Sequence, residues 1–157
     1  MSADSINRCA GSMVIRDINK ELKEKIVEIE RVREGLNKRK RGIKEGVYLD
    51  FIIKEIKKDI DKIKIKKPHA IHLPKYNEFG RINTTSYYLL DLYFPEYNLA
   101  IECDEIGHRD RCKNYEEQRQ KVCESKGVMF LRFNPDSKYF DVMDFVNTVK
   151  KYLTMKN

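Results

Sequence analysis

The stretch that decides the fold covers residues 87–104 and reads Tyr87-Tyr-Leu-Leu-Asp91-Leu-Tyr-Phe-Pro-Glu-Tyr-Asn-Leu-Ala-Ile-Glu102-Cys-Asp104. Two runs rich in aromatic and branched aliphatic residues flank a turn-forming Pro-Glu-Tyr-Asn segment, which predicts an antiparallel β-hairpin. Because successive side chains of a strand point to opposite faces, we expect one apolar and one acidic face. The apolar face takes Leu90, Leu92, Phe94, Leu99, Ile101 and Cys103, and the acidic face takes Asp91, Glu102 and Asp104.

The register of this hairpin brings two acids together. A loop of two or of four residues gives the same pairing, with Phe94 opposite Leu99 and Asp91 opposite Glu102. Opposed Cβ atoms lie roughly 4.5–5.5 Å apart, where like charges repel. A bound divalent cation would remove this conflict, because hard Mg²⁺ or Mn²⁺ prefers carboxylate oxygens. The alternative is that the acids form the solvated face of a two-sided sheet.

The segments after the hairpin predict a helix, a strand and a second helix. A polar loop leads from Asp104 into a helix over residues 114–125, which Gly127 ends. The apolar run 128–133 is typical of a buried strand. An amphipathic helix over residues 140–153 follows, with its apolar residues at helical spacing.

Three pieces of this region carry a resemblance to a known family. They are the string Asp91…Glu102-Cys-Asp104-Glu-Ile-Gly-His108, the helix Tyr115-Glu-Glu-Gln-Arg119, and the strand Leu131-Arg-Phe-Asn134. Residues 63–136 resemble the PD-(D/E)xK restriction-endonuclease-like superfamily, in its branch of very-short-patch repair endonuclease-like small nucleases. The resemblance implies a mixed α/β sheet flanked by helices and a metal-dependent phosphodiesterase site.

The resemblance also implies roles for single residues. Asp91 would be the first metal ligand and Glu102 the second. Asp104 occupies the third position, where the superfamily usually has Lys, and we expect it to be a further ligand. His108 would then take the role of the missing Lys, by polarising water or protonating the leaving oxygen, because its pKa lies near neutrality. Glu45 is the expected acid from the first core helix.

Glu55 is the alternative to Glu45 for that upstream carboxylate. Phosphodiester hydrolysis needs an activated water and neutralisation of developing negative charge, and carboxylates that hold Mg²⁺ meet both demands. Arg119 is expected to contact a phosphate through a bidentate fork, with Gln118 beside it on the same helix. The alternative for Arg119 is a salt bridge to Glu116 or Asp110.

Charge distribution points to a polyanionic partner. The net charge is +7, and residues 1–80 carry 20 Lys or Arg against 13 Asp or Glu. Basic clusters that fit the backbone of nucleic acid include Lys66 and Lys67, and Arg81 lies in a loop expected over residues 74–84. The alternative for these lysines is a solubilising helix face, because Lys and Glu are interleaved from residue 20 to residue 34.

The first part of the chain predicts two helices. Apolar residues recur near heptad spacing from residue 15 to residue 36, and a second helix is expected over residues 43–62. A first strand is expected at residues 63–65 and continues toward residues 69–73 despite Pro68. We therefore expect a basic helical extension, 1–42, and an endonuclease-like core, 43–157. The extension would pack on its own domain or pair with itself in a homodimer, and its few heptads favour the first.

The four cysteines lack the close pairing of a zinc ribbon or finger. Cys112 and Cys123 with His108 form a conceivable zinc site, but free intracellular thiols are the default because the sequence lacks a close cysteine pair. No secretory leader or membrane-length apolar run is present in the sequence, so we expect an intracellular protein, cytoplasmic or nuclear according to its host.

These patterns together predict a Mg²⁺- or Mn²⁺-dependent endonuclease that acts on DNA. The competing class is a catalytically inactive protein that kept the nuclease fold for nucleic-acid binding or for a structural role, because a fold does not guarantee chemistry. A helical oligomerisation module with an appended domain is the third alternative.

Overall fold

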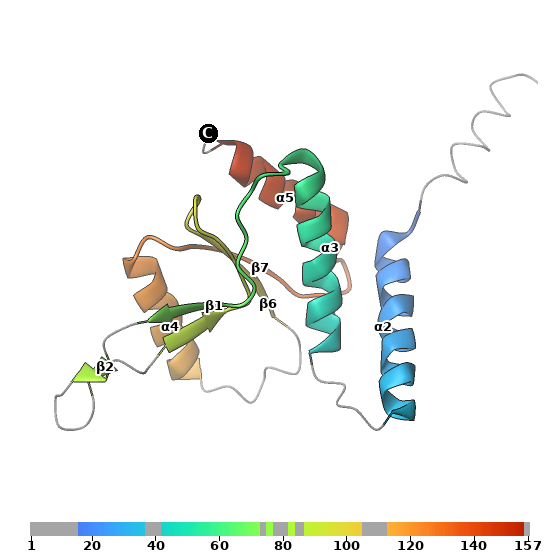
Figure 1. The fold of residues 1–157 in the computed structure, drawn as a ribbon, viewed down its shortest axis with the longest axis horizontal. Helices are drawn as coiled ribbons and strands as arrows, with labels where there is room; N and C mark the ends of the chain where they lie inside the picture. The colour runs from blue at the N-terminus through green and yellow to red at the C-terminus, as the bar shows by residue number, and fades with distance from the viewer. Residues whose placement is uncertain are drawn as a thin grey trace, which may run out of the picture. The chain divides into compact units, whose positions relative to one another are not determined.

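The computed structural model describes residues 16–36, 42–72, 75–76, 82–83, 87–104 and 113–155 (Figure 1). The chain divides into two compact units, Met1–Val47 and Tyr48–Asn157. In chain order the elements are α2 (Ile18–Gly35), α3 (Ile43–Asp59), β1 (His69–His72), β2 (Lys75–Tyr76), β3 (Ile82–Asn83), β4 (Tyr87–Leu90), β5 (Leu92–Phe94), β6 (Leu99–Cys103), α4 (Lys113–Ser125), β7 (Met129–Phe133) and α5 (Val142–Met155). This mixture of helices and strands confirms the predicted α/β class.

Helix α2 forms in the first unit, where the sequence predicted it. The side chain of Asp17 caps its start by accepting a hydrogen bond from the Lys20 backbone N–H at 3.1 Å. Leu22 and Ile26 are its buried residues. Its predicted pairing in a homodimer stays a prediction. So does the boundary between residues 42 and 43, which lies just before α3, whereas the compact units divide within that helix.

The second unit is built on a three-stranded sheet in the order β5-β6-β7. Strands β5 and β6 are antiparallel, with Phe94 paired to Leu99, which is the predicted hairpin register. Strands β6 and β7 are parallel, and α4 connects them along the chain. Parallel neighbours need a crossover of this kind, so the order β6-α4-β7 is a βαβ unit. In its register Glu102 pairs with Arg132.

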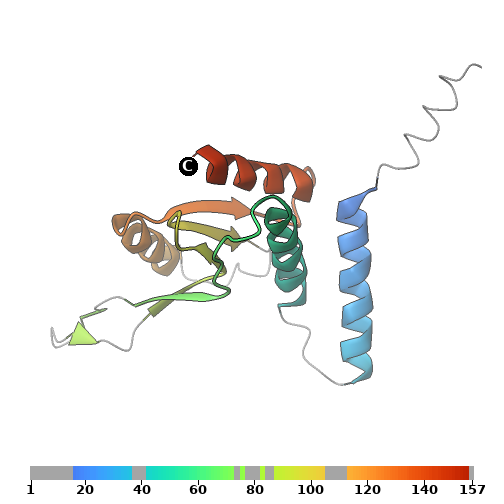
Figure 2. The same cartoon turned by 45° about the horizontal axis from the view of Figure 1, so that its top comes forward.

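One face of this sheet packs on α3 and α5. Its residues include Phe133, whose ring lies 6.1 Å from Tyr48 of α3 and 4.9 Å from Phe145 of α5. Phe140, just before α5, stacks on Phe133 at 5.5 Å. Figure 2 shows α5 running along the sheet. The four buried residues of α5 recur at helical spacing, as the sequence predicted, and are Val142, Val146, Val149 and Leu153.

The opposite face is also buried, which argues against the alternative of a solvated acidic face. Ala100 of β6 is fully buried in a cluster with Cys123 and Val128, and Val122 and Phe130 pack against this cluster. Glu102 has the same orientation as Ala100, because residues two apart on a strand share a face. Helix α4 therefore covers the acidic side of the sheet.

The predicted strand over residues 87–94 is broken at Asp91. The chain bends there, and β4 leaves the three-stranded sheet to pair with β1, with Leu90 opposite His69. The break changes the alternation, so Leu90 packs in the cluster of Ala100 instead of sharing a face with Leu92 as the sequence suggested. Two smaller antiparallel pairs, β1-β4 and β2-β3, thus accompany the main sheet.

The segment before the hairpin also differs from expectation. Helix α3 ends at Asp59, and no strand forms at residues 63–65, although Lys66 forms a single bridge with Tyr93. The part of the predicted strand beyond Pro68 does form, as β1, which is the first strand among the described residues. The predicted loop over residues 74–84 contains the short strands β2 and β3. Among the described residues, no helix has the length and apolarity needed to cross a membrane.

Gly127 allows a test of the turn that joins α4 to β7. Its φ is +84°, and an added Cβ would lie 3.0 Å from Nδ2 of Asn98. Gly127→Ala is expected to lower the free energy of unfolding by about 1–2 kcal/mol, the usual cost of a left-handed conformation for an L-residue. Urea unfolding of the purified variants measures this change.

Gly46→Ala is the matched control. Gly46 lies within α3, and a Cβ added there would meet nothing within 4 Å. This variant is expected to raise the free energy of unfolding by about 0.5–1 kcal/mol, because glycine in a helix loses more backbone entropy than alanine. Equal effects of the two substitutions would contradict the conformational argument for Gly127.

Candidate active site

Asp91 and Glu102 lie together where β5 begins and β6 approaches its end. Leu92 pairs with Ile101, so Asp91, one position before Leu92, lies next to Glu102, one position after Ile101. Its Oδ2 accepts a hydrogen bond from the backbone N–H of Cys103 at 2.9 Å. At this position the chain of β4 turns away toward β1, so the Asp91 carboxylate serves as the acceptor for that N–H. The hydrogen bond fixes the Asp91 side chain beside Glu102.

Arg119 of α4 is the buried partner of Glu102. Its Nη1 lies 2.7 Å from Glu102 Oε1, and the two side chains are only 4–5% exposed. The same Nη1 donates to the backbone oxygen of Leu89 at 3.0 Å. On the other side of the guanidinium, Nε and Nη2 lie 3.2 and 3.1 Å from Glu116 Oε2. Arg119 thus joins α4 to β4 and β6.

The pKa of Glu102 is raised to about 8, first because the side chain is buried and then because the Asp91 carboxylate lies beside it. The Arg119 guanidinium acts in the opposite direction, since a positive charge favours the ionised carboxylate. One guanidinium thus only partly offsets the burial of two neighbouring acids. A site of this kind gains from a further cation, which would favour the ionised form of both carboxylates.

Asp104 does not join this pair. Its Oδ1 lies 3.1 Å from Nη1 of Arg132, the residue that pairs with Glu102 in the parallel register of β6 and β7. Arg132 Nη2 donates to Oε1 of Gln120 at 2.6 Å, and Gln120 Nε2 donates to Glu124 at 2.9 Å. Asp104, Arg132 and Gln120 therefore form a second polar chain that links both strands to α4.

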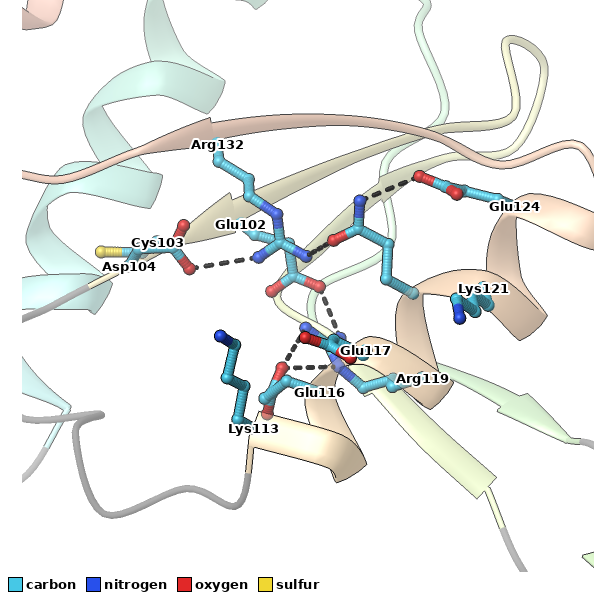
Figure 3. Close-up of a pocket in the computed structure, with 11 residues that line it drawn as sticks. Glu102, Cys103, Asp104, Lys113, Glu116, Glu117, Arg119, Lys121, Glu124 and Arg132 are labelled. Carbon is cyan, nitrogen blue, oxygen red and sulfur yellow. Dashed lines mark hydrogen bonds and ion pairs between the residues drawn. The ribbon is translucent and has the colours of Figure 1, made fainter.

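A pocket of about 600 Å³ opens between the ends of β6 and β7 and the face of α4 (Figure 3). Glu102, Asp104 and Arg132 enter it from the strands. Figure 3 shows the guanidinium of Arg132 beside the Asp104 carboxylate. On its other side, the guanidinium donates to the side-chain oxygen of Gln120 on α4. The helix contributes Lys113, Glu116, Glu117, Arg119, Gln120, Lys121 and Glu124. The pocket is thus lined by charged side chains of both signs.

The described residues contain no group of three or more His, Cys, Asp and Glu side chains close enough to hold a metal ion. Two of the three predicted ligands, Asp91 and Glu102, are adjacent, and each has one carboxylate oxygen held by the protein. Asp104 is turned to Arg132. The chemistry of the oxygen donors fits Mg²⁺, which binds through one or two carboxylates and keeps several waters.

The structure describes only some of the other residues that the sequence predicted for the site. His108 and Arg81 lie outside the described residues. Glu45 lies in the first turn of α3, in the first compact unit, so its role as an upstream acid stays a prediction. Glu55, its alternative, is paired with Lys58 at 2.7 Å.

The residues expected to bind nucleic acid are mostly exposed. Gln118 and Lys66 are exposed, and Lys67 Nζ lies 2.6 Å from Asp50 Oδ1. Arg119 is the exception, because it is buried and forms the salt bridge to Glu116 that was its alternative interpretation. Its pairing with Glu102 was not foreseen.

The conceived zinc site gains no support from the described part. Cys123 is buried in the cluster that contains Ala100, and His108 and Cys112 lie outside the described residues. Sequence reasoning also missed Arg132 as a residue of the site. The order strand, helix, strand was the signal that could have identified Arg132. A strand that follows a helix crossover runs parallel to the strand before it, and one side chain of β7, that of Arg132, lies beside Glu102.

Comparison with known proteins agrees with the predicted superfamily at a coarse level. The family model described as restriction endonuclease PvuRts1 I-like, N-terminal, matches residues 36–151, and no curated protein matches the chain. The matched range contains the strands, α4 and all of the pocket residues. The finer assignment to the very-short-patch repair branch stays a prediction. Because the match covers well over half of its length, the chain belongs to the family of PvuRts1 I-like restriction endonuclease N-terminal domains.

Proposed function

We propose that this protein is a metal-dependent endonuclease that hydrolyses phosphodiester bonds in DNA. The observation that carries the proposal is the adjacent pair Asp91 and Glu102, with Glu102 lining a pocket of charged residues, in a chain of a restriction endonuclease family. Two carboxylates at the end of neighbouring strands provide the hard oxygen donors that Mg²⁺ or Mn²⁺ prefers. The family description is also what favours DNA over RNA as the substrate.

Each residue of the site would have its own role. Asp91 and Glu102 would hold the cation, and the Cys103 N–H and Arg119 maintain the orientation of these two acids. A bound Mg²⁺ supplies an acidified water and neutralises charge on the phosphate. Asp104, half-exposed at the pocket, remains the candidate for a third ligand. His108 remains the candidate for the proton transfer at the attacking or leaving oxygen.

Binding of the DNA backbone is assigned to the basic part of the chain. Lys66 and Lys67 are exposed cations of the second unit, and Gln118 lies exposed on α4. Contacts of this type are independent of base sequence and weaken with salt. Arg81 and the excess of Lys and Arg in residues 1–80 are further candidates for such backbone contacts.

The direct test is cleavage of supercoiled plasmid DNA by the purified chain. Nicked or linear product is expected with Mg²⁺ or Mn²⁺, and none with EDTA, because the cation supplies the activated water. A parallel incubation with single-stranded RNA of similar length tests the substrate class. Absence of cleavage with both metals on both nucleic acids would reject the proposal.

A second candidate function has one specific observation in its favour. Arg119 already places a positive charge on Glu102, as a structural ion pair would in a protein that lost its metal site. Such a protein would bind nucleic acid without cutting it. Salt-sensitive DNA binding that is indifferent to Mg²⁺, together with no cleavage, would support this alternative.

A further inference from the structure

Arg119 and Arg132 both line the pocket, but they differ in how many of their donors are used. A guanidinium has five N–H groups. Arg119 is 4% exposed, and its contacts with Glu102, Glu116 and the Leu89 backbone oxygen involve all three of its side-chain nitrogens. Further contact with a ligand would require Arg119 to give up a buried partner. It is therefore poorly placed to bind a phosphate.

Arg132 has the opposite character. Its side chain is 30% exposed, and its two hydrogen bonds within the described residues, to Asp104 and Gln120, use two of the five N–H groups. The guanidinium lies 5.2 Å from the centre of the Phe130 ring, which supports it from one side. It is thus fixed in place while part of its fork remains available to a ligand.

The position of Arg132 relative to the acidic pair follows from the sheet. Arg132 pairs with Glu102 across the parallel strands β6 and β7, so both side chains leave the sheet on the same face. Both line the same pocket of about 600 Å³ (Figure 3). Pockets that hold small ligands typically measure about 300–1,000 Å³, so this one has room for a sugar-phosphate unit.

We propose that Arg132 is the residue that binds a DNA phosphate next to Asp91 and Glu102, and that Arg119 is a positioning residue for Glu102. This inference rests on the proposed nuclease function and deepens it. The planar fork of arginine matches a phosphate in bidentate geometry, which a lysine cannot reproduce. Asp104 accepts from one N–H of Nη1 and Gln120 from one N–H of Nη2, which leaves the Nε–H and one N–H on each of the two Nη atoms for the phosphate.

The charges of the pocket define the conditions for this binding. Its acidic residues are Glu102, Asp104, Glu116, Glu117 and Glu124, and its basic residues are Lys113, Arg119, Lys121 and Arg132. Because the acids at least balance the bases, a divalent cation bound to the acids is expected to strengthen the binding of a phosphate. Binding at Arg132 should therefore be measured with a cation present.

The experiment compares wild type, Arg132→Gln and Arg132→Lys in two assays. DNA binding is measured with Ca²⁺ in place of Mg²⁺ across a range of salt concentrations, and cleavage is measured with Mg²⁺. Arg132→Gln is expected to weaken binding about tenfold and to reduce the slope of log K against log salt by about 1, because one phosphate contact is lost. Its cleavage rate is expected to fall about 10²–10³-fold, as when one preorganised donor to a reacting group is removed.

Arg132→Lys keeps the charge but loses the fork. Its binding slope is expected to stay close to that of wild type, while its cleavage falls about tenfold or more, because the bidentate orientation of the phosphate is gone. Circular dichroism detects whether Arg132→Gln folds. If it does not fold, the cleavage rate of Arg132→Lys tests the proposal instead. Wild-type cleavage by Arg132→Lys would overturn the assignment of a bidentate contact.

Lys150→Gln is the matched control, because Lys150 lies on α5, outside the pocket, and its Nζ is also paired with a carboxylate, that of Asp59, at 2.8 Å. Equal losses of binding and cleavage in Lys150→Gln and Arg132→Gln would show that the effect comes from net charge alone and would overturn the inference. An inactive wild type would reject the proposed nuclease function separately. In that case an unchanged binding slope of Arg132→Gln overturns the phosphate contact, and a reduced slope supports it.

Discussion

Asp91→Asn and Glu102→Gln are each expected to lower Mg²⁺-dependent cleavage of plasmid DNA by about 10³-fold or more. A catalytic metal ion stabilises the transition state by several kcal/mol, and each loss of about 1.4 kcal/mol slows a reaction tenfold. Both amides keep an oxygen that can accept the hydrogen bond present in the wild type, from Cys103 in one case and from Arg119 in the other. The measurement is the single-turnover rate of plasmid nicking.

Binding separates this effect from a general loss of affinity. Both variants are expected to bind DNA at low salt as tightly as the wild type or slightly more tightly. Asp91→Asn removes a negative charge that repels the phosphates, and Glu102→Gln removes little charge near neutral pH, because the pKa of Glu102 is raised to about 8. A filter-binding titration without divalent metal checks this point. Loss of binding in parallel with cleavage would show that the acids maintain the fold and not the chemistry.

Glu96→Gln is the control for the hairpin. Glu96 is an exposed acid in the turn between β5 and β6, on the same hairpin as the acidic pair. Its neutralisation changes the net charge by the same amount, and cleavage by this variant is expected to equal that of the wild type. Equal rates in Glu96→Gln, Asp91→Asn and Glu102→Gln would exclude Asp91 and Glu102 as the site.

Arg119→Met is expected to lower the free energy of unfolding by about 3–5 kcal/mol, the usual cost of removing one partner of a buried ion pair. The substitution leaves Glu102 buried beside Asp91, and it also removes the donor to the Leu89 backbone oxygen. Methionine retains much of the apolar stem, so most of the effect comes from the lost charge and hydrogen bonds. Urea unfolding followed by circular dichroism measures the change.

A double variant identifies the source of this loss. Arg119→Met with Glu102→Gln is expected to be more stable than Arg119→Met alone, because the uncompensated acid is gone. Lys58→Met is the surface control, since Lys58 forms an exposed pair with Glu55 and such pairs contribute about 0–1 kcal/mol. A loss as small for Arg119→Met as for Lys58→Met would mean that the buried pair contributes little to the fold.

The hairpin could be predicted from the pattern of neighbouring residues alone. Alternation of side chains and the Pro-Glu-Tyr-Asn turn predicted the pairing of Phe94 with Leu99, because strand period and turn length are properties of neighbouring residues. The helices α4 and α5 were predicted within a few residues for the same reason. The bend at Asp91 was missed, since it depends on the pairing of β4 with the distant strand β1.

The sequence by itself therefore determined the α/β class, the hairpin register and the adjacency of Asp91 and Glu102, because each follows from spacing along a short segment. Only the tertiary structure decided which arginine pairs with which acid, with Arg119 paired to Glu102 and Arg132 to Asp104. Arg119 and Arg132 lie 17 and 30 residues from Glu102 in sequence, and their roles depend on how α4 packs over the sheet and on the parallel register of β7. Packing over such a distance is set by the burial of whole faces, which no local spacing encodes.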